Sequence, residues 1–414
     1  MSTSPDAAVQ IPPAPKERLV SLDVLRGLDL LLLLSLSFMG SLGNTLAEKY
    51  PDMSESVTKF FEQFQHVPWE GFSLCDLAMP LFLFMAGAAI PFSMARYRRD
   101  DGGMRRWRAW VRVLRRVVVL WIFGMMVQGN LLSLTPSRFK IFSNTLQAIA
   151  VGYFFSCLIY LYFPRVTHWV IFAGLLIAFW AANKYITLGE YGGGSYGETT
   201  NLAYGIDLKV FGQYRDGVTF NDDGSFTFNP GYTYTWILSS LTFVATSLSG
   251  MIAGDALYRT RAKLANGAGV SVKWRAFATI AVAAVICLVL GRVWGRLPET
   301  FYAYCPIVKH IWTPTMTLWS SGISLALLAA CYLLFDIIKA PKFLSFFFVV
   351  LGANSIVAYM TPHIFKVDQI SSCLVYGLEQ YVGIWYNPTL KFVSFLLTWL
   401  LLFDLWRYKR FFRI

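Results

Sequence analysis

The stretch that decides the fold joins an ionisable motif to a long apolar run, and over residues 65–87 it reads QHVPWEGFSLCDLAMPLFLFMAG. The apolar run from Leu74 to Phe92 is long enough for a helix that enters a lipid bilayer. His66, one of four histidines in the chain, precedes this run, and Asp76 lies near its start. Ionisable groups at the mouth of a membrane helix are costly, and a histidine with a carboxylate neighbour is suited to proton or acyl transfer. We therefore expect this motif to be functional.

Composition sets the class of the protein. Hydrophobic residues make up 56% of the 414 residues and charged residues only 14%, so a water-soluble globule could not bury the apolar side chains. We predict an all-α, polytopic integral membrane protein with about ten transmembrane helices. The apolar windows are Val24–Leu46, Leu74–Tyr97, Arg112–Leu134, Thr145–Phe163, His168–Ile186, Tyr234–Leu257, Trp274–Trp294, Thr315–Ile338, Phe343–Phe365 and Leu390–Trp406.

The distribution of Lys and Arg predicts the orientation. An even number of spans places both termini on one side, and assigning them to the cytoplasm puts two thirds of the 36 basic residues inside. The cluster from Arg96 to Arg116 dominates this bias. The net charge of +12 is thus a topology signal, and no nucleic-acid partner is expected. The expected location is the cell's inner (plasma) membrane.

The remaining segments suggest loops. Residues 1–17 lack the apolar core of a signal peptide and are predicted to be a disordered cytoplasmic tail, which leaves 18–414 as a single transmembrane domain. The segment at about 187–233 is rich in Gly, Tyr, Asn and Asp, and we expect an external loop there with a binding role. The prolines and mixed polarity of residues 296–314 predict a loop that dips into the protein. The six cysteines lack the spacing of a metal site or of a disulfide framework, so neither is expected.

Several motifs occur in the order found in one known family. Together they resemble the heparan-α-glucosaminide N-acetyltransferase family and its bacterial relatives over roughly residues 18–414. The motifs are RLVSLDVLRG at 18–27, His66 with Trp69, Gly71 and Asp76, PLFLFMAG at 80–87, LQAIA at 146–150, PIVK and IWT at 306–309 and 311–313, GANSI at 352–356 and WRYKR at 406–410.

The resemblance implies a transmembrane acetyltransferase. In this family acetyl-CoA is taken from the cytoplasmic side, its acetyl group passes to the amine of a sugar on the other side, and the histidine that matches His66 is catalytic. A neutral imidazole can act there as a general base or accept the acetyl group in a two-step route, and both mechanisms stay open. Asp76 matches the family's aspartate and is expected to hold the imidazole, although it could instead cap the helix that follows it.

The donor site should be basic, because CoA carries a 3′-phosphate and a diphosphate. Arg26, Arg115 and Arg116 lie at cytoplasmic ends of predicted helices and are the candidates. For Arg26 the alternative is an ion-pair ladder with Asp23 and Asp29, and for the other two it is ordinary anchoring at the membrane surface.

Two polar residues inside apolar helices, Gln147 and Asn354, also match family motifs. They are candidates to line a path for the pantetheine arm of acetyl-CoA, with hydrogen bonding between helices as the alternative.

The acceptor side is predicted from the same motif set. Ser37, Trp69, Lys309 and Trp312 are the candidates for contact with the acceptor. Close relatives of the heparan enzyme carry an asparagine ten residues after the Arg-Gly of the first span, where this chain has Ser37. We expect an amino sugar or glycan acceptor and N-acetyl transfer, with O-acetyl transfer to a glycan, or a transporter without covalent chemistry, as alternatives. Membrane lipids are expected partners, and a homodimer is left open.

Overall fold

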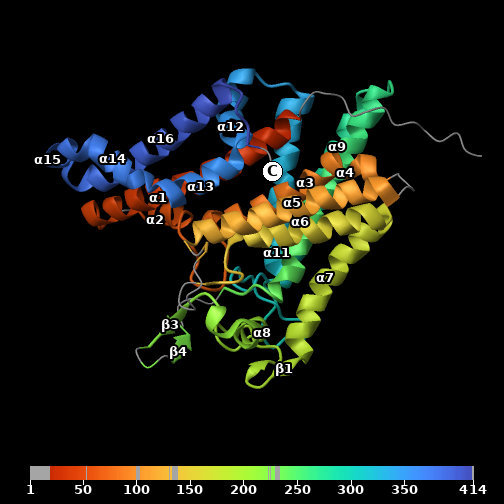
Figure 1. Cartoon of the computed structure of the whole chain (residues 1–414), viewed down its shortest axis with the longest axis horizontal. Coiled ribbons are helices and arrows are strands. Elements are labelled where there is room, and N and C mark those ends of the chain that lie inside the picture. The colour runs from red at the N-terminus through yellow and green to blue at the C-terminus, as the bar shows by residue number, and fades with distance from the viewer. Residues whose placement is uncertain are drawn as a thin grey trace, which may run out of the picture.

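The computed structural model is a bundle of long helices with loops and short elements gathered at one end (Figure 1). It describes residues 19–412 except 53, 99–102, 130, 133–138, 222, 224 and 229–233, so the predicted tail at 1–17 lies outside the described residues. The described strands form two small antiparallel hairpins, β1 (Thr187–Leu188) with β2 (Tyr191–Gly192) and β3 (Val218–Phe220) with β4 (Phe226–Phe228). The predicted all-α, polytopic fold class is confirmed.

The helices vary widely in length. Those of 18 residues or more are α1 (Val20–Lys49), α5 (Gly103–Val127), α6 (Thr145–Tyr162), α7 (Arg165–Tyr185), α9 (Ser239–Ala265), α10 (Ser271–Trp294), α11 (Pro314–Cys331) and α16 (Tyr386–Arg407). The shorter α-helices are α2 (Glu55–Glu62), α3 (Ala78–Ala88), α4 (Ile90–Arg98), α8 (Leu202–Phe211), α12 (Lys342–Ala353), α13 (Ser355–Phe365), α14 (Val367–Val375) and α15 (Glu379–Val382). Single turns are η1 (Leu74–Leu77), η2 (Gly212–Tyr214), η4 (Tyr376–Leu378), η5 (Gly383–Trp385) and the π-helical η3 (Tyr332–Ile337).

Each of the ten predicted apolar windows overlaps a helix, although α5 ends at Val127, before the end of the window Arg112–Leu134, and α9 begins at Ser239, after the start of the window Tyr234–Leu257. Among the described residues, seven helical segments are long and apolar enough to cross a membrane, or eight if the bent pair α12 and α13 forms one span. That pair bends by 60° at Asn354, between its two halves. Helices α1 and α5 are also long but lie outside this set, and α5 carries Arg112, Arg115 and Arg116 within its run. The molecule is therefore a multi-pass membrane protein, while ten spans and cytoplasmic termini stay predictions.

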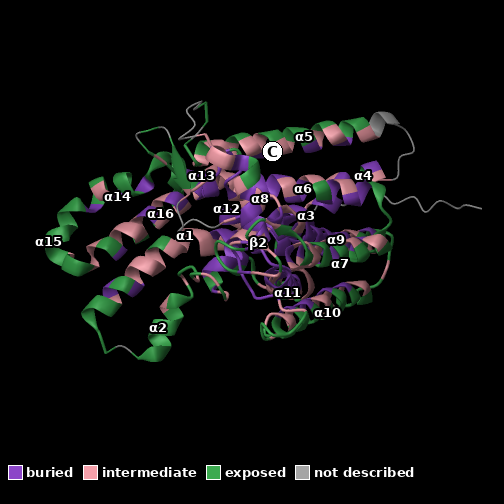
Figure 2. Cartoon of the chain, turned by 90° about the horizontal axis from the view of Figure 1, so that it is seen from below, coloured by how far each residue is buried: buried purple, intermediate pink, exposed green. Residues whose placement is uncertain are grey.

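The helices divide into a buried centre and an exposed periphery (Figure 2). The apolar window of α9 is 78% buried inside the protein, and the continuous segment from η1 to α4 is buried almost as fully. The window within α14 to α16 is only 11% buried. An apolar helix that is buried on all sides forms the core of the bundle, whereas exposed apolar helices suit contact with lipid.

Helices α3 and α9 pack so closely that their backbones touch at two glycines. A Cβ atom on Gly87 of α3 would lie 1.8 Å from the Ser247 carbonyl oxygen of α9, and one on Gly250 of α9 would lie 1.9 Å from the Phe84 carbonyl oxygen of α3. Small residues permit such contact between membrane helices. The helix that follows the His66 motif is therefore fixed against the centre of the bundle.

The loops predicted to be external lie at the same end of the bundle as His66. Trp69 donates a hydrogen bond from Nε1 to the Tyr196 carbonyl oxygen in the segment at 187–233, at 2.9 Å. Glu70 forms an isolated β-bridge with Val308, which lies in the loop between α10 and α11. That loop dips into the protein as predicted, since Cys305 and Val308 are fully buried.

The contact between α3 and α9 predicts a large effect of one methyl group. We expect Gly87→Ala to lower the free energy of unfolding by about 1–3 kcal/mol, because the added Cβ meets a backbone oxygen that cannot move aside. Gly174→Ala in α7 is the matched control: its Cβ would meet no atom of the described residues within 4 Å, and alanine favours a helix by about 1 kcal/mol relative to glycine. Unfolding of both variants in detergent, followed by circular dichroism, tests this. Equal stability of the two variants would contradict it.

Candidate functional site

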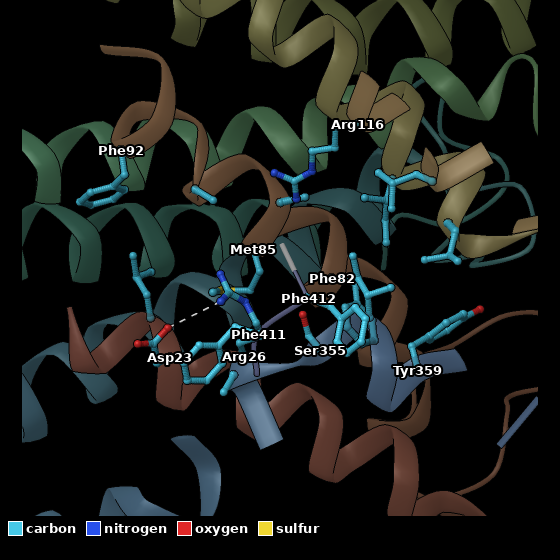
Figure 3. Close-up of a pocket in the computed structure, with 18 of the residues that line it drawn as sticks. Asp23, Arg26, Phe82, Met85, Phe92, Arg116, Ser355, Tyr359, Phe411 and Phe412 are labelled. Carbon is cyan, nitrogen blue, oxygen red and sulfur yellow. Dashed lines mark ion pairs between the residues drawn. The ribbon is translucent and has the colours of Figure 1, made fainter. Parts of the chain in front are cut away.

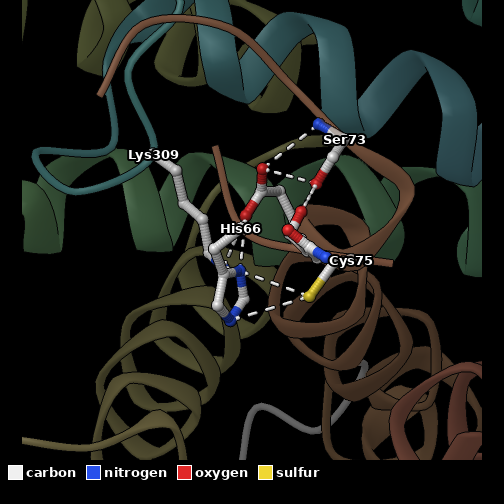
Figure 4. A network of polar contacts seen from close by, with 6 residues as sticks. His66, Ser73, Cys75 and Lys309 are labelled. Atoms are coloured by element: carbon white, nitrogen blue, oxygen red, sulfur yellow. Dashed lines mark hydrogen bonds and ion pairs between the residues drawn. The ribbon is translucent and has the colours of Figure 1, made fainter. Parts of the chain in front are cut away.

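His66 and Asp76 meet where the chain enters the bundle (Figure 4). His66 lies in the loop after α2, and Asp76 lies in η1, which continues directly into α3. The His66 Nδ1 atom is 2.8 Å from Asp76 Oδ1. The Asp76 side chain is buried, whereas that of His66 is 55% exposed. When Nδ1–H donates to the carboxylate, the lone pair of the neutral imidazole lies on Nε2.

Asp76 also caps η1, so both roles expected for it are present. Its Oδ2 accepts a hydrogen bond from the Ser73 backbone N–H at 3.1 Å and lies 3.0 Å from the Ser73 hydroxyl. The Ser73 hydroxyl also lies 2.7 Å from the Gln65 carbonyl oxygen. The cap thereby fixes the loop that carries His66.

Lys309 brings a cation to the same carboxylate from 233 residues farther along the chain. Its Nζ atom is 3.0 Å from Asp76 Oδ1 and 3.1 Å from His66 Nδ1. Burial opposes the charge on Lys309, but Tyr234 and Asp76 outweigh that effect and raise the pKa of Lys309 above its usual value. The lysine predicted to contact the acceptor therefore lies in direct contact with the histidine and its carboxylate.

Cys75 packs against the imidazole of His66. Its Sγ atom is 3.3 Å from Nδ1 and 3.6 Å from Nε2. A sulfur in the plane of the ring at these two distances would overlap Cε1, so the thiol lies over the ring face. Cys75 thus confines the imidazole from one side.

An aromatic stack stands beside this cluster. The His310 ring stacks on Trp69 with centroids 5.2 Å apart, and its centroid is 4.3 Å from that of Tyr234. Burial, and after it the Lys309 cation, lower the pKa of His310 to about 4. His310 is therefore neutral near pH 7, in contact with a lysine that is charged.

A cavity of about 340 Å³ opens onto the cluster. We name it the His66 cavity, and its lining includes His66, Cys75, Met79, Tyr234, Lys309 and His363.

Three of the predicted acceptor contacts are absent from the described lining of the His66 cavity. Ser37 is exposed on α1, while its neighbours Leu33 and Leu36 line the His66 cavity. Trp69 connects the loop that carries His66 to the segment at 187–233 through its hydrogen bond to the Tyr196 carbonyl oxygen. Trp312 is buried, and its Nε1 donates to Thr246 Oγ1 at 3.1 Å, so it packs in the core of the bundle and lines neither cavity described for this chain.

A second cavity, of about 560 Å³, has a basic wall (Figure 3). Arg26 of α1, Arg116 of α5 and Arg261 of α9 line it, together with apolar side chains, and we name it the arginine cavity. Arg26 Nη1 is 3.6 Å from Asp23 Oδ1, so this arginine combines the expected ion pair with the cavity position. The buried Nε atom of Arg116 has no hydrogen-bond partner among the described residues, and the guanidinium carbon lies 4.3 Å from the centroid of the Tyr153 ring.

Arg115, Gln147 and Asn354 do not line the arginine cavity within the described residues. Arg115 is exposed on α5, which fits anchoring at the membrane surface. The Gln147 side chain accepts from the Ser143 N–H at 2.8 Å and donates to the Ile141 carbonyl oxygen at 3.2 Å.

Asn354 uses both ends of its amide on the segment that follows α16. Its Nδ2 donates to the Arg410 carbonyl oxygen at 3.1 Å, and its Oδ1 accepts from the Phe412 N–H at 3.0 Å. Phe411 and Phe412 line the arginine cavity. Gln147 and Asn354 thus both hydrogen-bond to the protein's own backbone, and their contact with a pantetheine arm stays a prediction.

The two cavities follow one another along the same helices. Each of α1, α3, α5, α6 and α13 contributes residues to the lining of both. On α5, Arg116 lines the arginine cavity and Val127 the His66 cavity, eleven residues farther on. At the rise of an α-helix this separation is about 17 Å. The histidine cluster and the arginines therefore line two neighbouring cavities at successive levels of the same helices.

Sequence reasoning missed Arg261, Cys75 and Tyr234 at these sites. Arg261 belongs to a basic helix end, the same pattern that marks a cytoplasmic boundary. Cys75 adjoins Asp76 in the motif, but the cysteine spacing assigns it no role. Tyr234 stood at the edge of an apolar window, and no spacing pattern linked it to His66.

Comparison with known proteins finds one family model that matches part of this chain and a distant relative that matches most of it. Residues 18–177 match the model of a family described as "Domain of unknown function (DUF5009)". The chain is 21% identical to heparan-alpha-glucosaminide N-acetyltransferase of Homo sapiens over 391 residues, which cover 84% of this chain and 53% of that protein. The chain thus spans about half the length of this relative. This identity supports distant relatedness to a transferase.

The lowered pKa of His310 predicts acid sensitivity. Unfolding returns the imidazole to its ordinary pKa of 6.5, so between pH 6.5 and 4 the unfolded chain binds a proton that the folded chain does not. The stabilisation is therefore complete above pH 6.5 and is lost as the pH falls towards 4, by up to about 3 kcal/mol. We expect His310→Phe, which keeps an aromatic ring in the stack, to lose less stability than the parent protein between pH 7 and pH 5. Unfolding at the two pH values measures this, and an unchanged loss would refute it.

Proposed function

We propose that this chain is a membrane acetyltransferase that binds acetyl-CoA in the arginine cavity and transfers the acetyl group to an acceptor in the His66 cavity. The observation that carries the proposal is the shared lining of the two cavities, with three arginines at one end and the His66 cluster at the other. Guanidinium groups suit the phosphates of CoA. The long pantetheine arm of CoA suits the separation of about 17 Å between Arg116 and Val127 along α5. The distant relationship to an N-acetyltransferase supports the same reaction class.

The geometry of His66 fits either chemical route. In direct transfer, the nitrogen of an acceptor amine attacks the thioester carbon and gives its proton to Nε2, the C–S bond breaks, and the departing CoA thiolate receives the proton. In the two-step route, Nε2 attacks the thioester carbon, the C–S bond breaks and CoA leaves as the thiolate. The amine then takes the acetyl group from the imidazole, and the proton that the amine loses passes to the CoA thiolate. Asp76 stabilises the imidazolium in the first route and orients the ring in both. The buried Lys309 cation, 3.1 Å from the ring, suits negative charge that develops on the carbonyl oxygen.

The acceptor in this proposal is an amino sugar or a glycan outside the cytoplasm. The predicted orientation places the arginine cavity on the cytoplasmic side of an inner (plasma) membrane and the His66 cavity on the other side. The segment at 187–233 and the α10–α11 loop lie beside His66 and provide the surroundings in which an extracytoplasmic glycan would bind.

Removal of the imidazole tests the catalytic assignment. We expect His66→Ala to lower consumption of acetyl-CoA by about 100-fold, the usual scale for loss of a general base. His168→Gln is the matched control: His168 lies in α7, where its ring contacts the Phe163 carbonyl oxygen, and it lines neither cavity. Release of free CoA thiol by the purified proteins measures the rates. A His66→Ala protein of normal expression and parental rate would disprove the assignment.

The acceptor is decided by the position of the label from labelled acetyl-CoA. Glucosamine, a glucosamine-ended oligosaccharide and the N-acetylated forms of both are offered to the purified protein. Label on the free amines alone supports N-acetyl transfer. Equal labelling of the N-acetylated forms shows O-acetyl transfer, and sided uptake of a solute without any acetyl transfer shows a transporter.

The arginine cavity predicts a charge-dependent affinity for the donor. Each of Arg26→Gln, Arg116→Gln and Arg261→Gln should raise the KM for acetyl-CoA by about 10-fold, because a charged hydrogen bond contributes at least about 1.5 kcal/mol. Arg115→Gln is the control on the same helix, with its side chain outside the cavity. Initial rates over a range of acetyl-CoA concentrations measure the effect. A KM that changes equally in all four variants would contradict a specific donor site.

A further inference from the structure

Two aromatic residues stand at the junction of the two cavities. Phe82 of α3 and Tyr359 of α13 line both the arginine cavity and the His66 cavity, and among the described residues they alone appear in both linings. Their ring centroids are 6.0 Å apart, with the ring planes at 81°. These two rings in contact therefore stand at the boundary between the arginine cavity and the His66 cavity.

The helix that carries Phe82 shows this order along a single face. Met79 lines the His66 cavity only, Phe82 lines both, and Ala86 and Ala89 line the arginine cavity only. Spacings of three and four residues place these side chains on one face of a helix. Helix α13 repeats the order in reverse, with Ser355 on the arginine cavity, Tyr359 on both and His363 on the His66 cavity.

The two sides of the junction differ in how firmly they are held. Phe82 stands on α3, which the Gly87 and Gly250 contacts fix against α9. Tyr359 stands on α13, a helix of 11 residues that begins at the 60° bend with α12 and ends at the left-handed Lys366. An edge-to-face aromatic pair contributes only about 0.5–1.5 kcal/mol beyond its buried area, so the contact can be opened by a bound ligand.

We propose that Phe82 and Tyr359 form an aromatic partition between the cavities and that its aperture determines which acyl groups reach His66. This inference rests on the proposed function, in which the thioester end of the donor passes from the arginines to the imidazole. Two rings in edge-to-face contact leave no open gap, so even an acetyl thioester passes only when the rings separate. A longer acyl chain requires the rings to stay apart for more of its passage. The partition is thus the specificity determinant for the length of the acyl chain.

The first test compares acyl-CoA donors. With Phe82→Ala, and independently with Tyr359→Ala, the ratio of hexanoyl-CoA to acetyl-CoA consumption should rise by at least about 10-fold over the parent protein. Phe92→Ala is the matched control, because Phe92 lines the arginine cavity only. For this control the ratio should stay unchanged. An unchanged ratio in both partition variants, or an equal rise in the control, would overturn the proposal.

The second test measures accessibility on the two sides of the partition and requires no catalytic activity. Cysteines are placed at Met79 and at Ala89, a charged methanethiosulfonate reagent is added to one face of sealed membranes at a time, and the labelled peptide is identified by mass spectrometry. With the partition intact, each cysteine should react from one face only, and the two faces should differ. Adding Phe82→Ala should make the cysteine at Met79 react from the face that labels Ala89, at least about 10-fold faster than before.

The two tests separate the two proposals. A protein that consumes no acyl-CoA but shows the sided labelling would refute the acetyltransferase and retain the partition. Labelling of both cysteines from the same face in the presence of Phe82 would refute the partition, whatever the activity.

Discussion

The carboxylate of Asp76 is the constraint on which this end of the molecule depends. A buried carboxylate is tolerated only when donors surround it. Here the donors are two groups of Ser73, the imidazole of His66 and the ammonium of Lys309. They come from the loop before η1 and from the loop between α10 and α11, so satisfying one charge ties two distant parts of the chain to the mouth of α3. The geometry that orients the imidazole is the same geometry that allows the carboxylate to be buried.

The pairing of His66 with Asp76 was predictable because the two residues are close in sequence and the motif carries both. The membrane helices were also predictable, because a helix that crosses a bilayer requires a long apolar run and such runs can be recognised directly in the sequence. The contact with Lys309 was different: it depends on how a loop near the eleventh helix folds back, and no periodic pattern encodes a contact across 233 residues. The motif that contains Lys309 marked it as functional and left its partners undetermined.

The remaining candidates show why residue type alone does not assign a role. Arg116 and Arg115 are adjacent and equally basic, yet the 100° turn per residue of a helix places one in the cavity and the other outside it. Asn354 is polar within an apolar stretch, which identifies a need for partners but does not name them. In this structure the partners are backbone groups at 410 and 412, because the break between α12 and α13 turns the amide towards that segment.

The charges that line the two cavities help to distinguish an acyltransferase from a transporter. A transporter must release the whole solute at both ends, so strong and chemically different sites at the two ends would hinder it. Here the ends differ in kind: arginines suited to phosphate line one cavity, and an imidazole with a buried carboxylate and ammonium lines the other. A ligand that is anionic at one end and reactive at the other satisfies both sites at once while it stays bound. Such a ligand delivers a group across the junction and withdraws from the side on which it entered, which is the behaviour of a donor substrate.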